Sequence, residues 1–309
     1  MRRDTIDFRP IAGAAEERLR RSRIGISRLP SWSRSGIGLL LLALIVLPWL
    51  PVSRPPSDAA PAKRVRGVGA LAILTFAFAP HGETIATIQT DGRAALRDAA
   101  GGASAHSFLD YRGFALSLAF APDGRSLAVG GSEPDVFLYD LEAGGAGHPL
   151  GIPIRCVKGL AFSPDGRILA ASSYLDHEIV LWDLAAGRER ARLRGHGSAV
   201  ISLAFAPDGR SLASGGQSDE AIVVWDLATG RPLRRLSVPP QPVVCLAYSP
   251  DGRWLASTGD LGRQGRLWDL EGRCGNRQLG SLSSARDPLA FAPDGRMLAT
   301  ADADGAVRL

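Results

Sequence analysis

From residue 63 onward, the chain consists of short apolar runs separated by polar turns that are rich in proline and glycine. Some runs alternate between apolar and polar positions and others are continuously apolar, as in Glu178–Trp182 and Arg266–Trp268. Runs of this length and pattern are typical of β-strands. The pattern therefore predicts an all-β region built from many short strands.

The strand pattern repeats with a nearly constant period. An aromatic residue recurs every 42 or 43 residues, at Phe78, Phe120, Phe162, Phe205, Tyr248 and Phe291. Each precedes a turn of the form Ala/Ser-Pro-Asp-Gly, with His81 in place of the aspartate in the first copy. Proline at the second position and glycine at the fourth suit a type I turn between two antiparallel strands. A period of about 40–45 residues with strand patterning indicates a propeller array.

A third strand ends 19 or 20 residues after each of the first five aromatic residues. The five endings are Arg97-Asp98, Tyr139-Asp140, Trp182-Asp183, Trp225-Asp226 and Trp268-Asp269. A short turn then leads into a fourth strand, for example residues 231–236. This combination resembles the WD40 repeat family over roughly residues 63–309, and in particular a membrane-anchored, bacterial-type member. The resemblance implies a β-propeller of four-stranded blades around a central channel, with six recognisable blades.

The last repeat stops inside its predicted third strand. By the 19-residue spacing, position 310 is where the tryptophan of a Trp-Asp pair is expected, one residue past Leu309. Two explanations stay open. The chain is truncated from an array of seven or more blades, which the abrupt end favours, or residues 63–69 supply the missing fourth strand of the last blade and so remove an open sheet edge.

Three segments precede the repeats. Residues 1–34 form an arginine-rich tail, residues 35–53 carry no charge, and residues 54–62 form a Pro/Ala linker. A 19-residue helix rises about 1.5 Å per residue and comes close to the ~30 Å hydrocarbon thickness of a bilayer. We therefore expect a single-pass transmembrane helix or signal-anchor, with the tail in the cytoplasm and the propeller on the far side. The alternative is a signal peptide cleaved after residues 60–62, which would make the protein secreted.

Charge is concentrated in the N-terminal tail. Residues 1–36 hold nine arginines against four acidic residues, which accounts for the whole net charge of +5. The predicted propeller is therefore neutral overall and offers no electrostatic footprint for a nucleic acid. The three cysteines form no CxxC pair and no histidine has metal-ligand spacing, so we expect neither a metal nor another cofactor.

One repeat contains a set of residues that invites a hydrolase interpretation: His196, Ser214, Asp219 and Trp225. In the WD40 family, residues of these types at these positions form a structural hydrogen-bond network within one blade, and the resemblance implies the same role here. Elsewhere the set is incomplete. Asp176 with Trp182, and Asp304 with Thr300, match parts of it, whereas Ala171 and Val129 replace the hydroxyl and Arg97 replaces the tryptophan.

These observations predict a non-catalytic scaffold that presents propeller loops to a protein partner from a membrane. The candidate contacts lie in the loops between second and third strands, at Arg93, Tyr174, His177, Glu220 and Arg263. A fragment of a larger signalling protein is the first alternative. A ligand-binding or enzymatic propeller is the second, and it is disfavoured because the first-strand positions are apolar or small instead of a converging set of carboxylates, histidines or cysteines.

Overall fold

The computed structural model describes residues 73–82, 84–98, 105–143, 146–239, 241–259, 264–281, 289–301 and 307–308. The chain divides into two compact units, Met1–Pro55 and Pro56–Leu309, and all described residues belong to the second. The predicted tail, apolar segment, linker and closing strand at residues 63–69 lie outside the described residues. Within the described ranges, no helix has the length and apolar character needed to cross a membrane.

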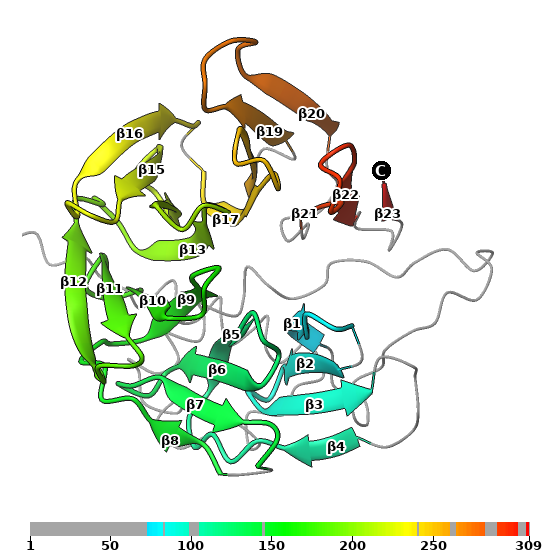
Figure 1. The fold of residues 1–309 in the computed structure, drawn as a ribbon, viewed down its shortest axis with the longest axis vertical. Coiled ribbons are helices and arrows are strands. Elements are labelled where there is room, and N and C mark those ends of the chain that lie inside the picture. Colours follow the sequence, from blue (N-terminus) through cyan, green and yellow to red (C-terminus); the bar gives the residue numbers. More distant parts are fainter. Residues whose placement is uncertain are drawn as a thin grey trace, which may run out of the picture. The chain divides into compact units, whose positions relative to one another are not determined.

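The described residues form six antiparallel sheets, which we call blades 1 to 6 (Figure 1). Blade 1 contains β1 (Ile73–Phe78), β2 (Thr84–Gln89), β3 (Ala94–Asp98) and β4 (Ala105–Phe108). Blade 2 contains β5 (Ala115–Phe120), β6 (Ser126–Gly131), β7 (Phe137–Asp140) and β8 (His148–Pro149). Blade 3 contains β9 (Val157–Phe162), β10 (Ile168–Ser173), β11 (Glu178–Asp183) and β12 (Arg188–Arg194).

Blade 4 contains β13 (Val200–Phe205), β14 (Ser211–Gly216), β15 (Ala221–Asp226) and β16 (Pro232–Ser237). Blade 5 contains β17 (Val243–Tyr248), β18 (Trp254–Gly259), β19 (Gln264–Asp269) and β20 (Arg277–Ser281). Blade 6 has three strands in the described ranges, β21 (Leu289–Phe291), β22 (Leu298–Ala301) and β23 (Val307–Arg308). The prediction of an all-β propeller with six recognisable blades is confirmed, with five blades complete.

The repeated turn forms as expected and also joins neighbouring blades. In blade 2, the Gly124 amide donates to the Ala121 carbonyl over 2.9 Å, and Gly124 has a φ of +71°, which favours glycine. The Asp123 carboxylate accepts from the Arg125 amide over 2.9 Å. From blade 2 to blade 6, the turn glycine also lies beside the turn proline of the preceding blade: a Cβ added at Gly166 would be 3.6 Å from the Pro122 ring. The same turn chemistry therefore shapes a hairpin and packs one blade on the next.

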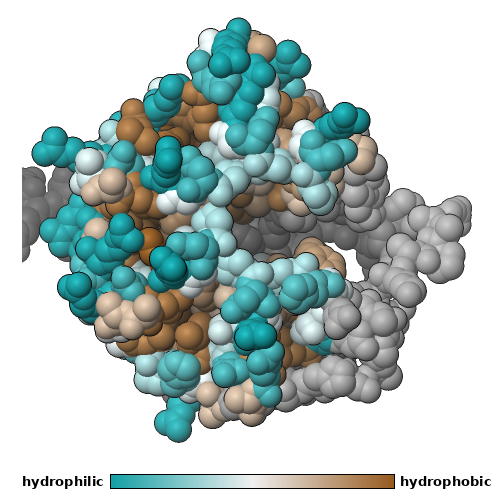
Figure 2. All heavy atoms as spheres, viewed as in Figure 1, coloured by the Kyte–Doolittle hydropathy of each residue, from teal (hydrophilic) through white to brown (hydrophobic). Residues whose placement is uncertain are grey.

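Most of the core lies between blades. The innermost strands of consecutive blades contact each other from β1 through β21. Four apolar clusters each draw residues from two successive blades; in the one between blades 3 and 4, Leu181 and Leu193 pack with Val223 and Trp225. Figure 2 shows hydrophilic residues over protruding parts of the surface and apolar ones in the recesses between them. A blade in the middle of the series is thus a layer whose two faces are covered by its neighbours.

Candidate functional site

The four residues of the complete set lie in one hydrogen-bonded chain in blade 4. The imidazole of His196, on the connector into β13, contacts the Asp219 carboxylate through Nδ1. Because a carboxylate only accepts, Nδ1 is the donor of this bond. On the other side of the ring, Nε2 lies 2.6 Å from Ser214 Oγ, which also accepts the indole N–H of Trp225 over 2.7 Å. This series of hydrogen bonds links the connector, β14 and β15.

This arrangement is not placed for nucleophilic catalysis. Ser214 is fully buried, and the side chains of His196 and Asp219 are 1% and 6% exposed. A serine nucleophile needs a free path to its substrate and an adjacent oxyanion hole. The Ser214 hydroxyl is instead enclosed between an imidazole and an indole. The structural role implied by the family resemblance is consistent with this geometry and remains a prediction.

Two other blades contain part of this series of hydrogen bonds. In blade 5, Trp268 donates to Ser257 Oγ over 2.9 Å, a pair that the sequence interpretation missed although its 11-residue spacing equals that of Ser214 and Trp225. In blade 1, Arg97 Nε donates to Thr87 Oγ1 over 3.3 Å. Arg97 therefore supplies a hydrogen-bond donor at the position where other blades have a tryptophan. The hydrogen bond to the second-strand hydroxyl is kept although the tryptophan is absent.

Blade 3 differs from the expectation for Asp176 and Trp182. The indole nitrogen of Trp182 is buried and has no hydrogen-bond partner in the described part of the chain, because Ala171 carries no hydroxyl. Asp176 does not join Trp182 in a network; it pairs with Arg155 and accepts from Ser173 over 2.9 Å. The Arg155 guanidinium holds the pKa of the Asp176 carboxyl below its usual range.

Arg155 comes from the connector into β9, as His196 comes from the connector into β13. The blade 3 pair is more exposed than its blade 4 counterpart, with the Arg155 and Asp176 side chains 66% and 23% exposed. Exposed ion pairs contribute little to stability. For blade 6, Asp304 lies outside the described residues, and Thr300 pairs through its backbone with Leu289 and Arg308.

The predicted contact loops share one side of the propeller, which we call the loop face; it carries the connections from second to third strands and from each blade to the next. The opposite side, with the Pro-x-Gly turns, is the turn face. Arg93, His177 and Glu220 are exposed on the loop face, and Tyr174 is half-buried. Burial raises the pKa of Tyr174, and a hydrogen bond to the Gln217 side chain of blade 4 opposes that shift. Arg263 lies outside the described residues.

Two of these residues hold an unusual backbone conformation. His177 and Glu220 immediately precede the third strands of blades 3 and 4 and have φ values of +58° and +52°. The equivalent residue of blade 1 is Gly92, with a φ of +81°. A left-handed conformation costs a residue other than glycine about 1–2 kcal/mol. Blades 1, 3 and 4 adopt this conformation before the third strand, and in blades 3 and 4 it is occupied by charged or titratable side chains.

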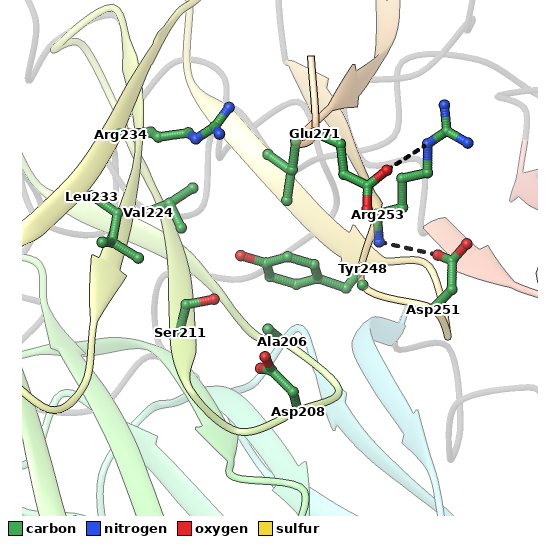
Figure 3. Close-up of a pocket in the computed structure, with 12 residues that line it drawn as sticks. Ala206, Asp208, Ser211, Val224, Leu233, Arg234, Tyr248, Asp251, Arg253 and Glu271 are labelled. Atoms are coloured by element: carbon green, nitrogen blue, oxygen red, sulfur yellow. Dashed lines mark hydrogen bonds and ion pairs between the residues drawn. The ribbon is translucent and has the colours of Figure 1, made fainter. Parts of the chain in front are cut away.

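A cavity of about 300 Å³ lies between blades 4 and 5 on the turn face. Figure 3 shows the Tyr248 ring directed from β17 toward the strands of blade 4. Burial raises the pKa of Tyr248 to about 12, while the Ser211 hydroxyl lowers it to a smaller extent. Leu233 and Arg234 of β16 line the opposite wall. The sequence interpretation did not single out this cavity, because its lining residues come from six separate segments with no shared motif.

The described residues contain no cluster of three or more histidine, cysteine or acidic side chains able to hold a metal ion. What the geometry provides is a rigid frame with two faces of loops. The arrangement suits binding at a surface.

Comparisons with known proteins agree with the repeat pattern. The family model described as WD domain, G-beta repeat, matches residues 146–183, 187–226, 230–269 and 289–309. The first three matches end at the Trp-Asp pairs of β11, β15 and β19. No curated protein sequence matches the chain.

A chain in a solved structure titled "Crystal Structure of Mitotic Checkpoint Complex" is similar in fold. It superposes with a TM-score of 0.66 at 21% identity, over 78% of this chain and 75% of that chain. At this identity the likeness concerns the fold alone. The matched segments and the six sheets lead to one conclusion: this chain carries repeats of the WD40 family and folds as a β-propeller of that family.

Proposed function

We propose that the protein is a non-catalytic scaffold that is tethered to a membrane by residues 35–53 and binds a protein partner through its loop face. One observation carries the proposal. His177 and Glu220 are exposed, belong to adjacent blades, and occupy a strained backbone position where glycine would be more stable. Side chains kept at such positions are candidates for contact with a partner, because the fold itself gains nothing from them.

The two side chains lie beside a cross-blade contact. Tyr174, in the same loop as His177, reaches Gln217 in the loop that carries Glu220. This contact links the loops of blades 3 and 4, and both loops extend from well-packed strands. A surface fixed in this way loses little conformational entropy when a partner binds. Arg93 and Arg263 extend the proposed surface to blades 1 and 5.

The test separates binding from folding. His177→Gly and Glu220→Gly each relieve a left-handed residue, and we expect the free energy of unfolding to rise by about 0.5–1 kcal/mol. Recovery of the partner by crosslinking from membranes should fall at the same time. His177→Ala is compared with His81→Ala, an exposed histidine on the turn face. Equal recovery from the two alanine variants would argue against the loop face.

Arg263→Glu provides a further arm of the same crosslinking experiment, because it reverses a charge at the predicted contact in blade 5. The tether is tested separately. With the proposed topology, residues 1–34 are digested by protease added to the cytoplasmic side of sealed membranes, and the propeller is protected. Release of the propeller by alkaline carbonate would support the cleaved signal peptide instead.

A further inference from the structure

The cavity between blades 4 and 5 contains a polar group that the other repeats lack. Of the six aromatic residues that precede the Pro-x-Gly turns, five are phenylalanine and only Tyr248 carries a hydroxyl. This hydroxyl is buried and makes no hydrogen bond within the described ranges. The Ser211 hydroxyl is close enough to affect the pKa of Tyr248 but does not complete a hydrogen bond to it. Because a buried hydroxyl without a partner destabilises a fold, the packing of the blades gives no reason for a tyrosine here.

Blade 4 presents smaller side chains to its neighbour than blade 3 does. Ile168 and Leu181 of blade 3 pack in the apolar cluster between blades 3 and 4. The strand register places Ser211 at the position of Ile168, because each pairs with the aspartate of its own Trp-Asp ending. Val224 precedes the tryptophan as Leu181 does, and the other four complete blades all have leucine at this position. The smaller side chains leave open space beside the tyrosine hydroxyl (Figure 3).

The walls of the cavity are largely aliphatic. Ala206, Val224, Leu233 and Leu270 line it together with the Tyr248 ring. Leu233, on the outer strand β16, is 57% exposed, so part of this wall is open to a ligand. The volume of about 300 Å³ lies at the lower end of the range for small-molecule sites, which are mostly apolar with a few polar groups.

Arg234 supplies a cation at this cavity that the described residues leave unpaired. Its side chain is exposed and makes no hydrogen bond or ion pair within the described ranges. Figure 3 shows the guanidinium extending from β16 toward blade 5. The three carboxylates that line the cavity already have donors: the Arg210 amide for Asp208, the Arg253 amide for Asp251, and the Arg273 guanidinium for Glu271. The charge that a ligand can balance is therefore positive.

We propose that this cavity is a binding site for a short aliphatic carboxylate, whose hydrocarbon chain lies against Leu233 and Leu270 while its carboxylate pairs with Arg234. The carboxylate also accepts a hydrogen bond from Tyr248. Burial raises the pKa of Tyr248, so its hydroxyl is protonated at neutral pH and can donate to an anion. The volume suits a branched chain of about four to six carbons. The site is on the turn face, so the proposal is independent of binding at the loop face.

The test titrates isocaproate into the 309-residue chain in detergent and measures binding by saturation-transfer NMR. For a ligand of this size we expect a dissociation constant on the order of 1 mM. Isocaproamide has the same shape without the charge and should bind about tenfold more weakly. N-Acetyl-leucine carries the same groups as the end of a peptide, so it distinguishes a free acid from a chain terminus.

Three variants test the roles of individual residues. Tyr248→Phe should weaken isocaproate binding about tenfold without lowering the thermal midpoint, because phenylalanine occupies this position in the other repeats. Arg234→Gln should weaken binding about two- to fivefold. Arg231→Gln is its matched control, because Arg231 is an exposed arginine just before β16 that does not line the cavity. Val224→Leu restores the leucine of the other blades and should abolish binding by filling the space.

Absence of saturation transfer to isocaproate at about 20 mM would overturn the proposal. Unchanged affinity in both Tyr248→Phe and Val224→Leu would also overturn it, because binding would then lie elsewhere. Equal affinity for isocaproamide would overturn the assignment of a carboxylate. If N-acetyl-leucine binds at least as tightly as isocaproate, the ligand is the C-terminus of a peptide; if it binds more weakly, the ligand is a free acid. Both of these results support the site.

Discussion

Replacing His196 with alanine should destabilise the propeller without affecting one specific activity. The substitution removes two hydrogen bonds, one to Ser214 over 2.6 Å and one to the Asp219 carboxylate. It also leaves that carboxylate buried, and its other oxygen, Oδ1, already has no hydrogen-bond partner among the described residues. Leaving a buried charge without its partner costs about 3–5 kcal/mol. For a domain of this size, the thermal midpoint should fall by roughly 10 °C.

Urea unfolding followed by tryptophan fluorescence measures this loss directly, and the control is His148→Ala, an exposed histidine of β8. We expect the control to change stability by less than about 0.5 kcal/mol. Adding Asp219→Asn to His196→Ala should restore part of the loss, because it removes the uncompensated charge. A loss below about 1 kcal/mol, or loss of partner binding at unchanged stability, would refute a purely structural role.

Three further outcomes follow from the packing and the pKa shifts. Ala171→Ser places a hydroxyl beside the unpaired Trp182 indole, as in blade 5, and should raise the free energy of unfolding by about 1 kcal/mol in urea titrations. Cys274 alone of the three thiols should react rapidly with a thiol reagent at pH 8, because burial raises the pKa of the other two. The Ser249 hydroxyl lowers the pKa of Asp251, so the hydrogen bond between them stabilises the fold at pH 7 and contributes less as the pH falls below about 4. Ser249→Ala should therefore lower the free energy of unfolding more at pH 7 than below pH 4, as urea titrations at both pH values would show.

The blade architecture was accessible from sequence because its signals are local. The Pro-x-Gly turn fixes where the first two strands meet, and the Trp-Asp pair marks where the third strand ends. Both signals depend on residues within a few positions of each other. The turn recurs in all six repeats, and the Trp-Asp pair is intact in three of them. Position 97 was harder to interpret: an arginine there looks like a lost tryptophan, yet its Nε reaches Thr87 in the folded blade.

Contacts between segments were less accessible. The pairing of Arg155 with Asp176 joins a connector and a loop 21 residues apart, and the family pattern places a histidine, not an arginine, on that connector. The cavity beside Tyr248 depends on which side chains of blade 4 face blade 5. The φ values of His177 and Glu220 were also hidden, since only Gly92 at the equivalent position of blade 1 suggests a left-handed backbone.

Phe78 and Phe120 show where a repeat pattern stops being informative. They occupy the same position in consecutive repeats, have the same side chain, and precede the same turn. Phe120 packs in a cluster shared by blades 1 and 2, whereas Phe78 is 57% exposed. Nothing within either repeat accounts for the difference, because the covering surface belongs to the preceding blade. In a propeller, the sequence of a repeat determines which side chains point to the neighbour, and the presence of the neighbour determines whether they are buried. Whether a first-strand aromatic residue is buried is therefore decided by the neighbouring blade and not by its own repeat.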